Sequence, residues 1–171
     1  MPETSAHAWR LESFGFGPVY DYVAGKQDWV SAGLPTEGQL PSRPRAGDVA
    51  RKDVPTCRVN EALDEVAERV RAAGWDASVV VNEERVVFGL LRAAELAAGR
   101  GRSVEEAMRP GPSTFRPNVP IEEMAGFMGE HQLHSAPVTT SDGRLVGLLL
   151  REEAERAAHE LHHAATEGDE R

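Results

Sequence analysis

The sequence contains two copies of one pattern, and a single shift along the chain relates the copies to each other. The stretch VVFGLL at 86–91 falls on RLVGLL at 144–149, which places Gly89 on Gly147. The chain before these glycines stays in register, without a gap, over about fifty residues. Chance periodicity does not produce agreement of this length, so we predict a duplicated structural unit.

Each copy contains an amphipathic helix ahead of its glycine. Apolar residues recur there at i, i+3, i+4 and i+7, which is the spacing of one helix face. The two faces consist of Leu63, Val66, Ala67 and Val70 in the first copy, and of Ile121, Met124, Ala125 and Met128 in the second. Asn60 and Asn118 precede these helices, and we predict that their side chains cap free backbone N–H groups.

A pair of strands follows each helix. Short apolar runs at 77–81 and 135–139 are separated by a polar break from longer apolar runs at 86–91 and 145–150. Asp142-Gly143 in the second break is a strong hairpin signal. Each copy therefore reads strand, helix, hairpin, helix, an α+β unit. We expect the two units to pack sheet against sheet with helices outside, leaving pseudo-twofold clefts of the kind that hold small ligands.

Composition narrows the classes of partner. The 171 residues carry 19 basic and 28 acidic side chains, a net charge of −9, and protonation of all six histidines would still leave −3. Nucleic acid is not an expected partner, because phosphate binding needs clustered cations. Neither a membrane-spanning run nor a signal peptide is visible, so we expect a cytoplasmic protein. Cys57 is the only cysteine; it reads as a small apolar side chain, with a redox or catalytic thiol as the alternative.

At these residues the sequence resembles the tandem CBS-domain pair, or Bateman module. The resemblance covers about residues 46 to 165 and rests on the duplicated register, on APV at 136–138, and on the apolar strands that lead into helices. It implies two repeats with pseudo-twofold symmetry and a homodimer of modules. It also implies an adenosyl ligand in the clefts, namely AMP, ADP, ATP or S-adenosylmethionine, and no required cofactor.

Family members that hold an adenosine commonly carry a Gly-x-x-Thr/Ser-x-x-Asp pattern, whose hydroxyl meets phosphate and whose Asp meets ribose. The first copy replaces the hydroxyl with Arg92 and the acid with Glu95, whereas the second has Leu150 and Glu153. The resemblance implies that Arg92 pairs with a phosphate and that the two glutamates accept from ribose. Leu150 offers a phosphate nothing, so the first cleft is the better candidate. The alternative for Arg92 and Glu95 is a solvated first helical turn.

Six further residues are candidate ligand contacts by the same resemblance. In the family, the start of the first strand lies near the base, and the start of the second strand flanks it. Simple strand packing is the alternative for the four residues in the second strands. The six residues are Thr56 and Thr114 in the first strands, with Ala77, Val79, Ser135 and Pro137 in the second strands.

The residue pattern of the leading segment differs from that of the two copies. Residues 5–38 predict a helix ending at Gly15 or Gly17, a strand at 19–22 and a helix around Trp29. VYDYVAGKQDW and AGLPTEG resemble the C-terminal end of a rhodanese-like domain. No cysteine precedes Cys57, so a persulfide nucleophile is missing and we interpret the segment as a structural remnant. Its aromatic residues are then core or contact groups, namely Trp9, Phe14, Phe16, Tyr20, Tyr22 and Trp29.

The predicted domain boundaries follow from these assignments. The rhodanese-like remnant occupies residues 1–38, and a linker containing two prolines occupies 39–47. The first CBS repeat occupies 48–102 and the second 103–166, followed by a disordered tail at 167–171.

Two histidine motifs remain. His159-Glu160-Leu161-His162-His163 satisfies the HExxH pattern of zinc hydrolases. The two outer histidines lie opposite the apolar stripe of their helix, so we expect a solvated face, with adventitious metal capture as the exception. His131 and His134 fit the C-terminal turn of a helix, where His⁺ suits the helix dipole; a metal pair or a pH-sensitive ligand contact is the alternative.

The sequence thus supports a non-enzymatic sensor of an adenine nucleotide. The rival is an assembly module whose clefts have lost their ligands, with protein partners unknown. A zinc-dependent hydrolase is a third hypothesis, and it requires a tightly held, stoichiometric metal.

Overall fold

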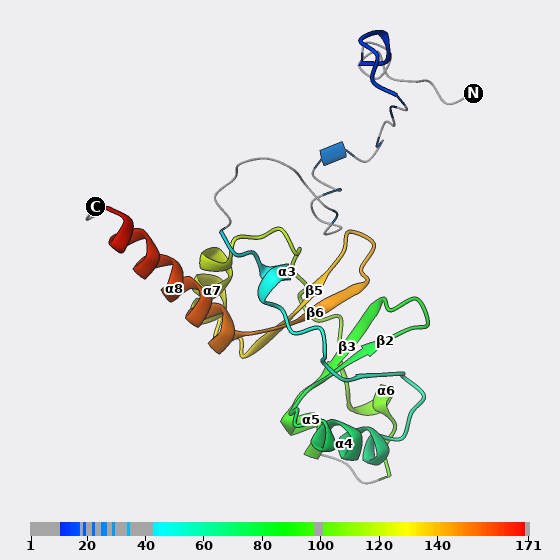
Figure 1. Ribbon diagram of the computed structural model, residues 1–171. Coiled ribbons are helices and arrows are strands. Elements are labelled where there is room, and N and C mark those ends of the chain that lie inside the picture. The colour runs from blue at the N-terminus through cyan, green and yellow to red at the C-terminus, as the bar shows by residue number, and fades with distance from the viewer. Residues whose placement is uncertain are drawn as a thin grey trace.

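The structure is a computed structural model that describes residues 11–17, 19, 22, 25–26, 29, 34, 43–97 and 101–169. Two similar halves lie against each other (Figure 1). The first half contains α3 (Ala46–Val49), β1 (Thr56–Cys57), α4 (Leu63–Ala72), β2 (Ser78–Val81), β3 (Val87–Leu91) and α5 (Ala93–Ala97). The second contains α6 (Val104–Ala107), β4 (Arg109–Pro110), α7 (Ile121–Glu130), β5 (Ser135–Thr139), β6 (Leu145–Leu150) and α8 (Arg151–Asp169).

The predicted duplication is confirmed by the element boundaries. The shift that carries Gly89 onto Gly147 also carries both ends of helix α4 onto both ends of α7. The antiparallel pairs β2–β3 and β5–β6 each contain a register shift at matching positions, after Val80 and after Val138. β1 pairs in parallel with β2 through Cys57 and Val80, and the same bridge recurs between Phe115 and Val138. We call two residues equivalent when this shift relates them.

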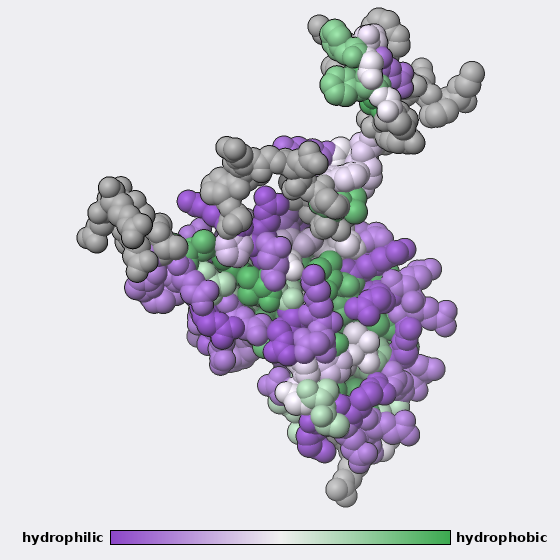
Figure 2. Space-filling view, in the orientation of Figure 1, coloured by the Kyte–Doolittle hydropathy of each residue, from purple (hydrophilic) through white to green (hydrophobic). Residues whose placement is uncertain are grey.

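Packing follows the predicted layers. One sheet has the strand order β1-β2-β3-β4 and the other is the pair β5-β6. A cluster between the sheets draws on both repeats, with Val79 and Leu90 meeting Leu145 and Leu148. Two further clusters lie between each sheet and its own helices, and all predicted face residues of α4 are buried. In Figure 2, hydrophilic residues cover most of the visible face of the two repeats, and hydrophobic residues show mainly toward its middle.

A short segment at the start of each repeat packs on the other repeat. We call it the lead segment; it lies around α3 in the first repeat and around α6 and β4 in the second. α3 precedes the first repeat, yet the Ala46 N–H donates to the Val119 carbonyl at 2.8 Å. The equivalent bond runs from Val104 in α6 to Glu61 at 3.0 Å. After α3, Arg51 bridges to Leu148 of β6, just as Arg109 of β4 pairs with Leu90 of β3. These reciprocal contacts give the two repeats their pseudo-twofold symmetry. They also place each lead segment beside the last strand of the other repeat, β6 or β3.

The same exchange explains why the predicted asparagine caps are wrong. The N-cap residues are Ala62 and Pro120, and neither makes a side-chain cap hydrogen bond. Instead, the first N–H of each helix donates to the other repeat's lead segment, from Leu63 to the Arg102 carbonyl and from Ile121 to the Pro44 carbonyl, both at 3.0 Å. Free N–H groups at a helix start need acceptors, and here a backbone carbonyl supplies one.

The predicted hairpin turns are confirmed, although the two differ in chemistry. Gly143 has a φ of 82°, and its equivalent Arg85 has a φ of 65° without being glycine. The turns meet at the pseudo-twofold axis, where Val86 bridges to Arg144, its own equivalent. The axis is thus fixed by backbone pairing between the two hairpins.

Two boundary predictions need correction. The predicted linker at 39–47 overlaps α3, because backbone bonds to the second repeat hold the chain helical from Ala46. α8 continues to Asp169, so residues 167–169 are helical and not part of a disordered tail, because they extend a long proline-free helix. Residues 170–171 lie outside the described residues.

The leading segment is described only in part. Residues 11–13 are helical and end before Gly15, which has a φ of 87° as the predicted stop requires. Val19 and Tyr22 have no strand assignment, while Tyr20, Asp21 and Trp9 lie outside the described residues. Phe14 and Phe16 are 69% and 63% exposed, so they are not core residues because no described element covers them. Among the described residues, no helix is long and apolar enough to cross a membrane.

Candidate functional site

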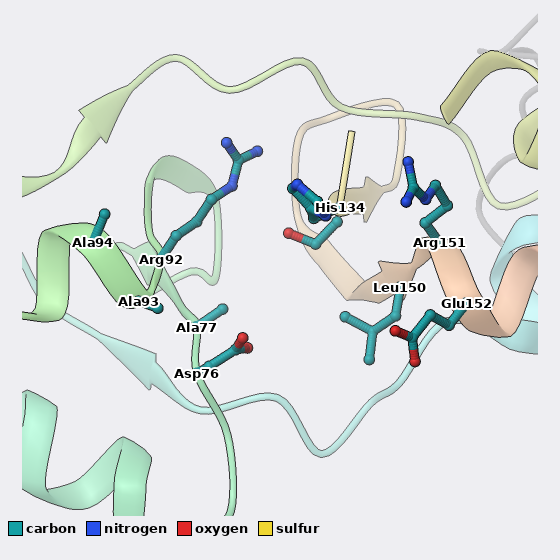
Figure 3. A pocket seen from close by; sticks show the side chains of 10 residues that line it. Asp76, Ala77, Arg92, Ala93, Ala94, His134, Leu150, Arg151 and Glu152 are labelled. Carbon is teal, nitrogen blue, oxygen red and sulfur yellow. The ribbon is translucent and has the colours of Figure 1, made fainter. Parts of the chain in front are cut away.

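A cavity of about 360 Å³ straddles the pseudo-twofold axis between the repeats (Figure 3). We call it the axial cavity. Its ten lining residues form five equivalent pairs, so each repeat contributes the same positions. They are Asp76 with His134, Ala77 with Ser135, Arg92 with Leu150, Ala93 with Arg151, and Ala94 with Glu152.

The charges in the axial cavity are unevenly placed. Arg92 follows β3 and Arg151 opens α8, so the two guanidinium groups approach from opposite repeats with His134 between them (Figure 3). Asp76 and Glu152 lie lower in the same view. The repeats are symmetric in backbone but not in side chains, which gives this cavity a cationic side.

A second cavity, of about 270 Å³, joins the end of β3 to the start of β5, and we call it the first cleft. It includes Arg92 and Ser135, which also line the axial cavity. Its lining contains two arginines and no carboxylate, an unusual balance in a chain of net charge −9. The residues are Leu90, Arg92, Arg109, Pro110, Pro112, Ser113, Leu133, Ser135, Ala136 and Pro137.

Arg92 is one of the two residues that line both cavities, and its guanidinium is not fully hydrogen-bonded. Its Nε is buried and has no hydrogen-bond partner. A buried donor left unpaired costs free energy comparable to a lost hydrogen bond. An anion at the boundary of the cavities would supply the acceptor that this guanidinium lacks.

Glu95 sits one helical turn after Arg92 and already has partners. Its Oε1 accepts from Arg109 at 2.6 Å and its Oε2 accepts from the Arg92 backbone N–H at 3.0 Å. Burial would raise the pKa of Glu95, but the bonds from Arg109 and Arg92 outweigh it and hold the pKa below its ordinary value. The carboxylate is therefore ionised and held by the lead segment of the second repeat.

The equivalent position in the second repeat repeats this pairing more loosely. Arg51 Nη1 lies 3.6 Å from Glu153 Oε1, and Glu153 Oε2 is buried without a partner. Arg51 also donates to Asp53 at 2.8 Å, a bond that lowers the pKa of Asp53. Its guanidinium stacks over the Trp75 ring at 4.6 Å.

These contacts lie at the positions equivalent to the first cleft, which we call the second cleft. Trp75 stands where the first cleft has Leu133, and Leu150 stands where it has Arg92. Both side chains pack against the central cluster that contains Val79 and Leu148. The second cleft thus has a tryptophan and a leucine at the positions where the first has a leucine and an arginine.

The structure brings together only part of the predicted site. Arg92, Ala77, Ser135 and Pro137 line the two cavities. The remaining predicted residues do not line these two cavities. Val79 is fully buried in the core, and Thr56 of β1 pairs with it. Thr114 is exposed beside Ser113 of the first cleft, and Glu95 and Glu153 pair with arginines.

Sequence reasoning missed the contribution of the lead segments. Arg109, Pro110, Pro112 and Ser113 enter the first cleft because β4 pairs with β3 of the other repeat. A signal was present, since the shift that relates the two copies places Arg51 on Arg109. Asp76 and Arg151 also line the axial cavity without having been singled out.

The other candidate groups, Cys57 and the histidines, have the environments of structural or surface residues. Cys57 is 2% exposed, and burial raises the pKa of its thiol and so disfavours the thiolate form. His131 ends α7, where its Nδ1 lies 3.0 Å from the Phe127 carbonyl oxygen. His159 and His163 are exposed, as predicted from the apolar stripe. Within the described part of the chain, no cluster of three or more His, Cys, Asp or Glu residues could hold a metal ion.

A family model described as the CBS domain matches residues 46–99 and 104–160. The chain belongs to the CBS domain family. The two matched ranges begin at the first residues of α3 and α6, so each CBS domain includes its lead segment. The match gives no support to the rhodanese-like resemblance of residues 1–38.

Two curated relatives of this CBS pair are each 25% identical to it. One is an uncharacterised Methanopyrus kandleri protein, aligned over 60% of this chain and 57% of its own length. The other is a Methanohalobium evestigatum homoserine O-acetyltransferase, aligned over 67% of this chain but only 24% of its own length. The aligned region thus spans little more than half of the first relative and about a quarter of the second.

Solved structures share the CBS-pair fold. Arabidopsis thaliana CBSX2 in complex with AMP is 22% identical, with a TM-score of 0.63 over 70% of this chain and 98% of that one. The cytosolic domain of the magnesium channel MgtE in complex with ATP is 25% identical, with a TM-score of 0.62 over 67% and 49%. The CBS pair of protein MJ0100, with 5′-methylthioadenosine and S-adenosylmethionine, is 22% identical, with a TM-score of 0.59 over 66% and 93%.

Proposed function

We propose that this protein is a non-enzymatic regulatory module that binds one adenine nucleotide per chain. The adenosine part lies in the first cleft, and the phosphates extend past Arg92 toward the axial cavity. The observation that carries the proposal is the Arg92 guanidinium, whose buried Nε has no partner at the boundary of the two cavities. The family supports it, since three structurally similar proteins are complexed with AMP, with ATP, and with two adenosyl compounds.

Charge supports a phosphorylated ligand over S-adenosylmethionine. Arg92 lines the first cleft, whose lining contains no carboxylate, so it favours a phosphate and disfavours a sulfonium cation. Arg151 and His134 lie further along the axial cavity, where a longer phosphate chain would reach them. We therefore expect ADP or ATP to bind more tightly than AMP.

The test is isothermal titration of stripped protein with adenosine, AMP, ADP, ATP and S-adenosylmethionine. We expect one site per chain. Arg92→Ala should weaken ATP by about tenfold to a hundredfold, because a hydrogen bond to a charged group contributes about 1.5–3 kcal/mol, and should leave adenosine nearly unchanged. Arg156→Ala, an exposed arginine on α8 outside both cavities, is the matched control. Equal weakening of ATP and adenosine would contradict the placement of the phosphates.

The second candidate function is a homodimeric assembly module without a ligand. The favouring observation is that both glutamates of the family pattern are already paired with arginines, Glu95 with Arg109 and Glu153 with Arg51. If no compound in the panel binds, this function takes precedence. Light scattering then measures the dimer that both candidates include.

A further inference from the structure

The solvent-facing side of α8 carries a pair of histidines that neither cavity uses. His159 and His163 are one helical turn apart, and their Nε2 atoms lie 3.0 Å from each other. The rings meet edge to face, with centroids 4.5 Å apart. Both residues are exposed, so the pair is open to solutes.

We propose that His159 and His163 bind one divalent transition-metal ion of the Cu²⁺, Ni²⁺ or Zn²⁺ class. Metal–imidazole distances are about 2.0–2.1 Å, so two nitrogens at right angles around an ion lie about 3 Å apart. The observed 3.0 Å spacing meets this requirement without side-chain movement. Tetrahedral Zn²⁺ needs about 3.4 Å, which a small ring rotation supplies.

The helix fixes the pair before the ion arrives. Residues four apart on a helix lie on one face, and α8 is anchored upstream by the fully buried Ala154. The two imidazoles are therefore preorganised, and the second nitrogen binds at a high effective concentration. Glu155, one turn before His159 on the same helix, pairs with Arg151 at 3.5 Å.

The site is a binding site and not a hydrolase centre. Two protein ligands on an open helix face lack the third ligand and sheltered pocket of catalytic zinc. The divalent series predicts that Cu²⁺ binds most tightly and that Ni²⁺ and Zn²⁺ follow. Because a ligating imidazole must be unprotonated, acidification should release the ion.

The test uses the full chain after chelator treatment, titrated with NiCl₂ by calorimetry. We expect one Ni²⁺ per chain, loss of binding on acidification, and a higher Tm with Ni²⁺ present. His159→Ala and His163→Ala should each weaken binding at least about tenfold, because each removes the chelate.

His162→Ala is the matched control. His162 is on the same helix but faces α7, with its Nε2 3.9 Å from Glu122 Oε1, so this variant should bind Ni²⁺ like the parent. All three histidines are exposed, and circular dichroism verifies that the variants fold. Parent-like affinity in His159→Ala, or equal loss in His162→Ala, would overturn the proposal. Cu²⁺ spectra showing a single nitrogen ligand would overturn it independently.

Discussion

The two glycines that define the duplication should differ in their tolerance of a methyl group. A Cβ on Gly147 would lie 2.8 Å from the Arg51 carbonyl oxygen and 3.1 Å from its carbon. These backbone atoms are held by two hydrogen bonds of 2.9 Å, from Arg51 N–H to the Leu148 carbonyl and back. Relief therefore requires the lead segment to separate from β6.

The equivalent clash at Gly89 is easier to relieve. Its Cβ would lie 2.5 Å from Met108 Sδ, the flexible part of that side chain, and 3.2 Å from the Arg109 carbonyl oxygen. A changed methionine rotamer costs about 0.5–1.5 kcal/mol. At Gly147, two lost hydrogen bonds cost about 1 kcal/mol each, and residual overpacking adds about 1–3 kcal/mol.

We therefore expect Gly147→Ala to destabilise the protein by about 3–5 kcal/mol, and Gly89→Ala by about 1 kcal/mol. The reduced freedom of the unfolded chain is common to both variants, so it cancels in the comparison. Urea unfolding monitored by circular dichroism measures the difference as a shift in midpoint at constant slope. Equal losses, or a larger loss at Gly89, would refute the role assigned to the exchanged lead segments.

Two predictions concern the first cleft. Arg109→Gln should strengthen adenosine binding by up to about fivefold, because it frees Glu95 from an exposed ion pair that contributes at most about 1 kcal/mol. Calorimetry measures the change in affinity. Weaker binding of adenosine would instead make Arg109 a ligand contact. The folded pKa of Glu95 lies below its ordinary 4.5, so its stabilisation is present above that pH and is lost as the pH falls through the folded value. Glu95→Gln should thus be less stable than the parent at pH 7, with a gap that closes on acidification, and a gap independent of pH in thermal melts would disprove the coupling.

The sequence determined the repeat and its local elements. The spacing of Leu63, Val66 and Val70 predicted a helix face that is buried in the structure, and the shift between the two copies predicted the boundaries of α7 from those of α4. Periodicity has this power because it is a local property of helices and strands. Arg92 was also predictable, since it stands at the hydroxyl position of the family pattern.

The tertiary structure decided what each repeat receives from the other. The sequence placed Asn60 as a cap, whereas the chain caps α4 with the distant Arg102 carbonyl. It indicated Glu95 and Glu153 as ribose contacts, whereas both meet arginines from the exchanged lead segments. Such pairings depend on which surfaces meet when the halves fold together, and no local pattern encodes them.

The difference between the two clefts was likewise determined in part by the sequence and in part by the tertiary structure. The sequence alone showed that Leu150 replaces Arg92 at the equivalent position. Only the packed structure placed the Trp75 ring against Arg51 on one side and the central cluster on the other. A residue's type is fixed by the sequence, but the space it fills is fixed by its neighbours, because close packing is a property of the whole core.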